Sequence, residues 1–280
     1  MPTACVVIPV HRLCLEKYET IALERCVEIL AAHPQVIVAP SLLDLRALRA
    51  RFSSLQVETF ADEFFAGVAG YNRLMLADEF YARFAHYDYL LIHQLDAFVF
   101  SDQLGSWCAK GYDYIGAPWL PEGPLSTVWQ DVLGSIRRAR ARRKNQDFAL
   151  QYFYAVGNGG FSLRRVAAMR EALRRMQVQA AEYRRQIAAV CNEDIFFSIE
   201  ANRSRRWIRA PGYREAAAFA WELQPRKAAI INRDQLPFGC HGWNKQPREQ
   251  WRSVFARVGY SVDDMLDSAS AAATPGVSQA

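Results

Sequence analysis

The stretch Tyr87–Phe100, YDYLLIHQLDAFVF, constrains the fold of this chain more than any other. Its apolar run Tyr89–Ile92 is short and aromatic-rich, which is typical of a strand buried on both faces of a parallel sheet. Polar residues His93 and Gln94 end the run, and Asp96 follows soon after. Because open α/β sheets bind ligands at the carboxyl ends of their strands, the pattern predicts that Asp96 can reach a ligand or a metal.

Asp96 also has a structural interpretation, as the cap of a helix expected from Gln103 to Lys110. Ser101 and Asp102 are better placed to cap that helix. The apolar residues 97–100 after the acid are also untypical of an exposed turn. We therefore favour a functional role for Asp96.

Strands and helices alternate in the first third of the chain. Strands are expected at Ala4–Val10, Val36–Ala39, Leu55–Phe60 and 89–92, and helices at Glu16–Ala31, Leu42–Arg51 (capped by Ser41) and Gly70–Phe84. This alternation predicts an α/β fold with a mostly parallel central sheet flanked by helices. Neither GxGxxG nor GxxxxGK[ST] follows a strand, which counts against a dinucleotide enzyme or a P-loop NTPase.

The remaining two thirds of the chain give weaker patterns. We expect a strand at Tyr112–Gly116, a loop with an exposed aromatic at Ala117–Pro121, a long helix at Arg165–Ala189, and shorter helices at Ile195–Glu200, Glu215–Trp221 and Arg248–Val258. Small and polar residues dominate the C-terminus, which predicts one domain over residues 1–266 and a disordered tail over 267–280.

Composition narrows the function classes. Of the 280 residues, 51% are hydrophobic, which suffices for a large core, and six cysteines without a CxxC motif suit a reducing cytoplasm. We see no signal peptide and no apolar run of about 18 residues, the length of a spanning helix. The net charge of +5 suits an anionic ligand or membrane surface but does not suggest nucleic acid.

The run Arg137–Lys144, RRARARRK, has two interpretations that both stay open. It is either the solvated face of a helix or a patch for anionic lipid headgroups, which attract basic residues by about 1 kcal/mol each. In the second case the protein lies in the cytoplasm, peripherally at the inner membrane surface.

Four short sequence blocks follow one another along the chain: QLDAFVF, GNGGFSLR, NEDIFF and FGCHGW. Their order carries a family resemblance. With them the chain resembles, from Cys5 to Trp251, an uncharacterised bacterial family of nucleotide-sugar glycosyltransferases of GT-A (Rossmann-like) fold. The resemblance implies an inverting enzyme that moves a sugar from a nucleotide-diphosphate donor to a hydroxyl of a glycan or glycolipid, in surface polysaccharide or lipid-linked oligosaccharide biosynthesis.

The resemblance also implies a divalent cation, Mn²⁺ or Mg²⁺, held on the donor diphosphate by a DxD motif. Here Gln94-Leu95-Asp96 keeps only the last acid. The implied metal ligands are Asp96 and His241, with Gln94 beside them. The alternative is a metal-independent enzyme in which cationic side chains replace the metal, with Lys245 binding the diphosphate.

The same resemblance assigns roles to further positions. Asp194 is the implied general base with Glu193 as its acidic neighbour, both opening a helix behind the cap Asn192. Implied donor-binding residues are Pro9, His11, Arg12, Gln94, Asp96, Asn158, Gly159, Gly160 and Lys245, and implied acceptor-binding residues are Trp119, Glu222 and Trp243. The paired glycines admit close backbone approach and positive φ.

Each of these residues has a plainer structural interpretation. Acids in a first helical turn complement the helix dipole by about 0.3–1 kcal/mol, and lone histidines and tryptophans more often pack in a core. Two other functions also remain. A catalytically inactive glycan-binding module is favoured by the missing acid at 94. A nucleotidyltransferase is disfavoured because residues 9–14 after the first strand contain no glycine.

Overall fold

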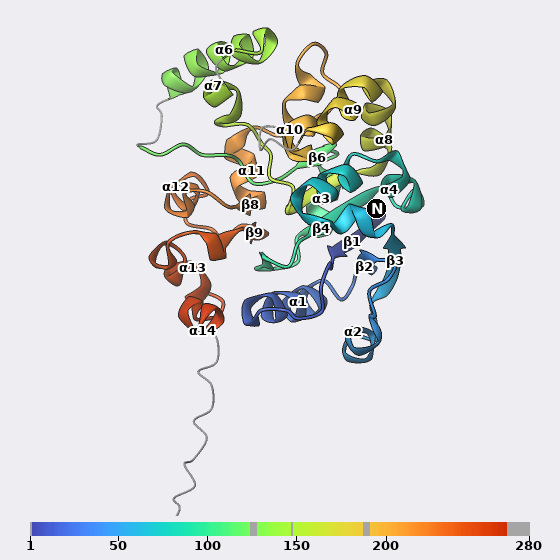
Figure 1. The fold of residues 1–280 in the computed structure, drawn as a ribbon. Helices are drawn as coiled ribbons and strands as arrows, with labels where there is room; N and C mark the ends of the chain where they lie inside the picture. The colour runs from blue at the N-terminus through green and yellow to red at the C-terminus, as the bar shows by residue number, and fades with distance from the viewer. Residues whose placement is uncertain (1, 124–127, 147, 187–190, 268–280) are drawn as a thin grey trace, which may run out of the picture.

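The computed structural model describes residues 2–123, 128–146, 148–186 and 191–267 (Figure 1); the expected tail beyond residue 267 lies outside these ranges. The strands are β1 Ala4–Pro9, β2 Gln35–Pro40, β3 Gln56–Phe60, β4 Tyr89–His93, β5 Ala97–Val99, β6 Tyr114–Ile115, β7 Phe161–Arg165, β8 Ala220–Trp221 and β9 Gly239–His241. The α-helices are α1 Lys17–Ile29, α2 Arg46–Arg51, α3 Gly67–Met75, α4 Asp78–Arg83, α5 Leu104–Ala109, α6 Val128–Lys144, α7 Phe148–Tyr152, α8 Val166–Arg175, α9 Gln177–Arg185, α10 Glu193–Ser198, α11 Tyr213–Phe219, α12 Pro225–Ile231, α13 Arg252–Ala256 and α14 Val262–Leu266.

The main sheet has the strand order β3-β2-β1-β4-β7-β6 within the described residues. Its first four strands run parallel, whereas β7 is antiparallel to both β4 and β6. The expected α/β fold with a mostly parallel sheet is therefore confirmed, and the strand of the organising stretch, β4, lies in its middle.

Side chains of the central strands alternate between two apolar cores. Val6 and Ile8 of β1 pack with α1 and α5 on one face, while Cys5 and Val7 pack with α3, α4 and α8 on the other. Figure 1 shows α1 and the pair α3–α4 on opposite sides of these strands. Because both faces are covered, the strands read as continuous apolar runs, as parallel strands do.

A second, three-stranded sheet has the order β5-β9-β8. The sequence patterns did not predict β5, which begins directly after Asp96. β5 pairs antiparallel with β9 so that Ala97 faces His241 in register. This pairing places Asp96 beside His241 although 145 positions separate them in the chain.

Two helices expected as continuous are interrupted. The helix expected over 70–84 is α3 followed by α4, and the one expected over 165–189 is α8 followed by α9 within the described residues. Met75 and Phe80 both pack in the same apolar core. A continuous helix would direct residues five apart about 140° away from each other. The break at Leu76 keeps both on the sheet.

Smaller differences affect the helix ends. Helix α2 begins at Arg46, because the Ser41 hydroxyl donates to the Phe60 carbonyl at 2.9 Å instead of capping a helix. The expected last helix is shortened to α13, preceded by a 3₁₀ turn at Arg248–Gln250, and α14 was not predicted.

Two tryptophans that the resemblance implied as acceptor-binding, Trp119 and Trp243, are buried. Trp119 is 2% exposed and stacks on Tyr152 with ring centroids 4.2 Å apart. Trp243 is 1% exposed and packs against Phe255 at 4.5 Å. The exposed-loop prediction for Trp119 is wrong because the ring fills the space beside Gly157, where a Cβ would lie 1.8 Å from it.

All six cysteines are unpaired, as expected. Among the helices in the described ranges, none combines the length and apolar character needed to cross a bilayer.

We predict that Trp243→Ala lowers the free energy of unfolding by about 3–5 kcal/mol, the scale of a buried aromatic deletion. Trp243→Phe should cost far less, because its ring still packs on Phe255 and the indole N–H it loses has no partner in the described part of the chain. Urea unfolding of both variants measures this. Equal stability of the alanine variant and wild type would contradict a core role.

Candidate functional site

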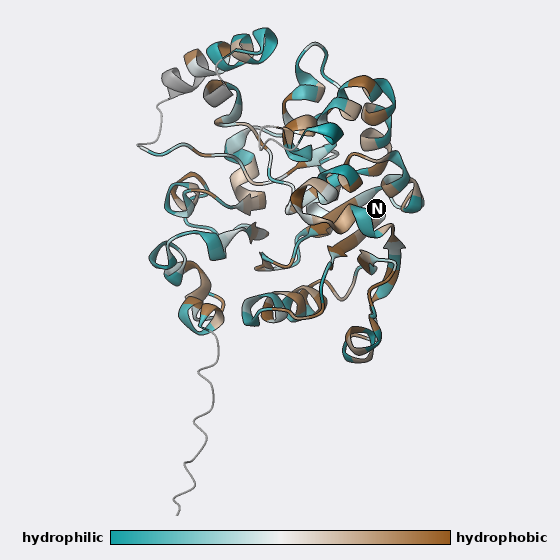
Figure 2. Cartoon of the chain, viewed as in Figure 1, coloured by the Kyte–Doolittle hydropathy of each residue, from teal (hydrophilic) through white to brown (hydrophobic). Residues whose placement is uncertain are grey.

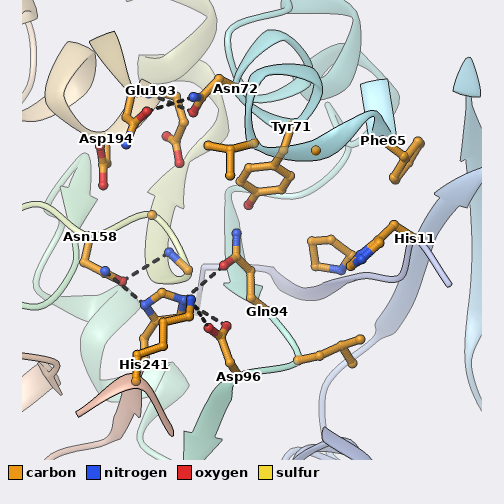
Figure 3. Close-up of a pocket in the computed structure, with 18 of the residues that line it drawn as sticks. His11, Phe65, Tyr71, Asn72, Gln94, Asp96, Asn158, Glu193, Asp194 and His241 are labelled. Atoms are coloured by element: carbon orange, nitrogen blue, oxygen red, sulfur yellow. Dashed lines mark hydrogen bonds and ion pairs between the residues drawn. The ribbon is translucent and has the colours of Figure 1, made fainter. Parts of the chain in front are cut away.

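A cavity of about 540 Å³ opens at the carboxyl ends of β1 and β4. Of the residues singled out in the sequence it brings together Pro9, His11, Gln94, Asp96, Asn158, Gly159, Gly160, Glu193, Asp194, Glu222, His241 and Lys245. Figure 3 shows most of them converging on the cavity from the two sheets and from α10.

Three expected residues do not line the cavity. Arg12 is not in the lining, although its guanidinium donates to both carboxylate oxygens of the lining residue Glu19, at 2.8 and 2.7 Å, and to the carbonyl of Cys14. Trp119 and Trp243 lie in apolar cores, so stacking on an acceptor sugar is not available to them.

At one end of the cavity Asp96 is paired with two basic side chains. Its Oδ1 lies 3.0 Å from His241 Nε2, and its Oδ2 accepts from Lys245 Nζ at 2.8 Å. Burial alone would raise the pKa of Asp96, but His241 and Lys245 hold that pKa well below its usual range. Asp96 and Glu222 in turn outweigh burial and raise the pKa of His241 to about 9.

Two amide side chains complete this cluster. Gln94 Oε1 lies 3.0 Å from His241 Nε2, and Asn158 Nδ2 lies 3.0 Å from His241 Nδ1 (Figure 3). The Asn158 Oδ1 accepts from the backbone amides of Gly160 and Phe161, at 3.2 and 3.4 Å. These bonds fix which end of the Asn158 amide faces the imidazole.

The paired glycines of the GNGG block make room for two polar side chains. A Cβ on Gly159 would lie 1.9 Å from Glu193 Oε1, and one on Gly160 would lie 2.0 Å from His241 Nε2. Close approach is thus the reason for both glycines. The expected positive φ is found instead at Asn158, whose φ is 48°.

At the other end, Glu193 is held by a buried ion pair. Arg164 is fully buried and donates to Glu193 Oε1 at 2.9 Å and to the Gly159 carbonyl at 3.2 Å. Glu193 lines the cavity, and its buried Oε2 has no partner among the described residues. The second oxygen of Glu193 therefore keeps unused hydrogen-bonding capacity beside the cavity.

Asp194, one residue on, differs from Glu193 in its surroundings. Its Oδ1 accepts from the Ile195 amide at 2.7 Å. Burial, and then the charges of Glu193 and Glu222, raise the pKa of Asp194 to about 7. A carboxylate with a pKa near neutrality accepts and returns protons efficiently.

The sequence patterns missed the wall formed by α3 and the turn before it. This wall contributes Phe64, Phe65, Gly67, Val68, Tyr71 and Asn72 to the cavity. Asn72 accepts from the Glu193 amide at 3.2 Å and donates to Asn192 Oδ1 at 2.9 Å. Asn192 is the N-cap residue of α10 as expected, but its side chain makes no cap bond, and Asn72 supplies one to the Glu193 amide. No local pattern relates residues 120 positions apart.

The comparisons with known proteins give a family. The model of the family described as "Protein of unknown function (DUF5672)" matches residues 54–241, two thirds of the chain. The chain belongs to this family. No curated protein matches it in sequence.

Solved structures with a similar fold identify the fold of this DUF5672 chain. Mouse xyloside xylosyltransferase 1 in its apo form matches with a TM-score of 0.54 and 12% identity, over 88% of this chain and 100% of that one. An active-site mutant of LgtC matches with a TM-score of 0.51 and 13% identity, over 85% of this chain and 86% of that one. The DUF5672 chain therefore has a GT-A-like fold, as the resemblance implied.

The implied metal ligands do not fit a divalent cation as they lie. No group of three or more His, Cys, Asp and Glu side chains suited to a metal occurs in the described part of this DUF5672 chain. Hard cations such as Mg²⁺ prefer several oxygen ligands. Here the one carboxylate, Asp96, already pairs both of its oxygens with basic side chains.

We predict that Asp194→Asn stabilises the protein increasingly as the pH rises from 4 to 8. Because the folded pKa of Asp194 lies above the unfolded value, the wild type loses stability as pH rises between these two pKa values. Asn removes that loss. Thermal unfolding at pH 4, 6 and 8 measures the difference. An advantage that does not grow with pH would contradict the raised pKa.

Proposed function

We propose that the protein is a glycosyltransferase that moves a sugar from a nucleotide-diphosphate sugar to a hydroxyl of a glycan or glycolipid, as in polysaccharide biosynthesis. One observation carries the proposal. A carboxyl group with a pKa near 7, Asp194, shares one cavity with the cationic cluster on Asp96, at the ligand-binding edge of a GT-A-like sheet.

The proposed mechanism is a single inverting displacement. Asp194 accepts the proton of the acceptor hydroxyl, and the hydroxyl oxygen forms a bond to the anomeric carbon as the bond from that carbon to the diphosphate oxygen breaks. The ammonium of Lys245 neutralises the charge on the departing nucleoside diphosphate. Asp194 and the cationic cluster line different parts of the cavity, which supports attack opposite the leaving group (Figure 3).

Glu193 and Asp194 have separate roles in this proposal. Arg164 neutralises Glu193 and orients it, so that Glu193 Oε2 accepts a bond from a sugar hydroxyl. Glu222 Oε2 is likewise buried without a partner among the described residues and suits an acceptor hydroxyl. Gly159 and Gly160 form part of the cavity wall around the donor sugar. Pro9 and His11 line the cavity at the end of β1, where the nucleoside would bind.

A glycan-binding module without activity is the second candidate, favoured by the single acid at Asp96. Calorimetry with a panel of nucleoside diphosphates and their sugars separates the two. A glycosyltransferase binds at least one of them in the micromolar to millimolar range, which is usual for enzyme substrates. A module that binds glycans alone would show no nucleotide binding.

We predict that Asp194→Asn lowers kcat on the donor so identified by about 100-fold or more, the scale of general base catalysis. Wild-type kcat should rise with pH through about 7, as Asp194 ionises. Donor affinity should stay near the wild-type value. Full turnover by the Asn variant would remove Asp194 from the mechanism, and Asp78→Asn, on the exposed face of α4, serves as control.

We further propose that α6 contacts an anionic membrane that carries the acceptor. Its outward residues recur at helical spacing and are all exposed: Leu133, Ile136, Arg137, Arg140 and Lys144. On the inner side Arg142 donates to the Gln151 carbonyl at 2.9 Å. Apolar and basic side chains on one exposed face are typical of helices that lie in a membrane interface. Figure 2 shows that α6 is otherwise largely hydrophilic.

We predict salt-sensitive binding to vesicles containing phosphatidylserine and none to pure phosphatidylcholine. Replacing Arg137, Arg140 and Lys144 by Gln should weaken sedimentation with vesicles about 100-fold, at roughly 1 kcal/mol per charge. The control replaces Arg170, Arg174 and Arg175 of α8, which pair with acids, by Gln. Equal binding by both triple variants would leave α6 as a solvated helix.

A further inference from the structure

The hydrogen bonds around His241 determine what its Nε2 can do. Nδ1 faces the Asn158 Nδ2 donor at 3.0 Å, so in the neutral imidazole Nδ1 is the acceptor and Nε2 carries the proton. In the imidazolium form both nitrogens carry protons, and the Nδ1 proton, which faces the Asn158 donor, is the one more readily lost. In both forms Nε2–H points at Asp96 Oδ1 and Gln94 Oε1, each 3.0 Å away.

A metal ligand needs a free lone pair on Nε2, which requires the other tautomer. In that tautomer Nδ1–H would face the Asn158 Nδ2 donor. Turning the Asn158 amide would resolve the clash but break its bonds with the amides of Gly160 and Phe161. Glu222 Oε1 is 3.5 Å from Nδ1, which is long for a hydrogen bond. The arrangement therefore selects against a metal at His241.

Lys245 supplies the charge that a metal would otherwise bring. Its ammonium is on a side chain that is 66% exposed, and one of its three donors is used on Asp96 Oδ2. Two donors remain for a ligand in the cavity that Lys245 lines. Asp96, which the DxD comparison marks as a metal ligand, here positions a lysine.

We propose that the donor diphosphate binds in this cavity without a divalent cation, on the Lys245 ammonium that Asp96 positions, while Asn158 keeps His241 a hydrogen-bond donor to Asp96. This rests on the proposed function for the identity of the ligand. The part concerning the metal stands on the geometry of Asn158, His241 and Asp96 alone.

The first test uses calorimetry with UDP, GDP, CDP and ADP, each in EDTA and in Mn²⁺. For whichever nucleotide binds, the wild-type affinity should agree within about threefold in the two conditions. Lys245→Ala should weaken binding about tenfold or more in both, the scale of a charge-assisted hydrogen bond. Lys110→Ala is the matched control, because Lys110 pairs with Glu215 outside the cavity.

The second test measures Mn²⁺ alone, by the loss of the free-ion electron paramagnetic resonance signal. The wild type should not bind Mn²⁺ at millimolar concentration. Asn158→Asp should gain Mn²⁺ binding, because a carboxylate there accepts the proton of His241 Nδ1 and releases the Nε2 lone pair. Adding His241→Ala to that variant should abolish the gain.

The outcomes separate the two proposals. Mn²⁺ binding by the wild type, or a nucleotide affinity that falls tenfold in EDTA, overturns the metal-free site and leaves the glycosyltransferase proposal standing. Binding of no nucleotide in any condition overturns both the glycosyltransferase proposal and the role of Lys245. Absence of wild-type Mn²⁺ binding would then support only the part concerning His241.

Discussion

The pairing of β5 with β9 is the constraint on which the site depends. It sets Ala97 against His241, and the Gly242 amide donates to the Asp96 carbonyl at 3.1 Å. These backbone bonds hold the Asp96 and His241 side chains together before any ligand arrives. Lys245 follows one short turn later and reaches the same carboxylate. A polar cluster built from two distant segments is thus fixed by a three-stranded sheet.

At the other end of the cavity, the buried ion pair of Arg164 and Glu193 fixes the position of the Glu193 carboxylate. Removing two charges from water is costly, and such a pair rarely adds net stability. Arg164 recovers part of the cost through bonds to Tyr81, Ser162 and the Gly159 carbonyl. A core of apolar residues would serve stability equally well, so the pair is better explained by the position in which it holds Glu193 beside the cavity.

Sequence patterns predicted β1 to β4 and β6 of the main sheet, but not β7, which lies between β4 and β6. They also singled out Asp96, because the polar end of a buried strand lies at the ligand-binding edge of a parallel sheet. His241 and Asp194 came instead from the resemblance to glycosyltransferases. The patterns could not predict β5, three residues long, or the Asn72 cap, which depends on a contact between helices far apart in sequence. Trp119 was wrongly expected at the surface, because a tryptophan in a loop carries no sign of the core it fills.

The two ends of the cavity differ in their electrostatic character. At one end Asp96 and Glu222 face His241 and Lys245, and the exposed ammonium of Lys245 can meet an anion such as a diphosphate. At the other end burial, and then the charges of Glu193 and Glu222, raise the pKa of Asp194. A displacement at a sugar needs both: a cation where the leaving group gains charge and a basic carboxylate where the acceptor loses its proton. The Gly159–Gly160 backbone touches both Glu193 and His241, so one loop sets the relation between the two ends.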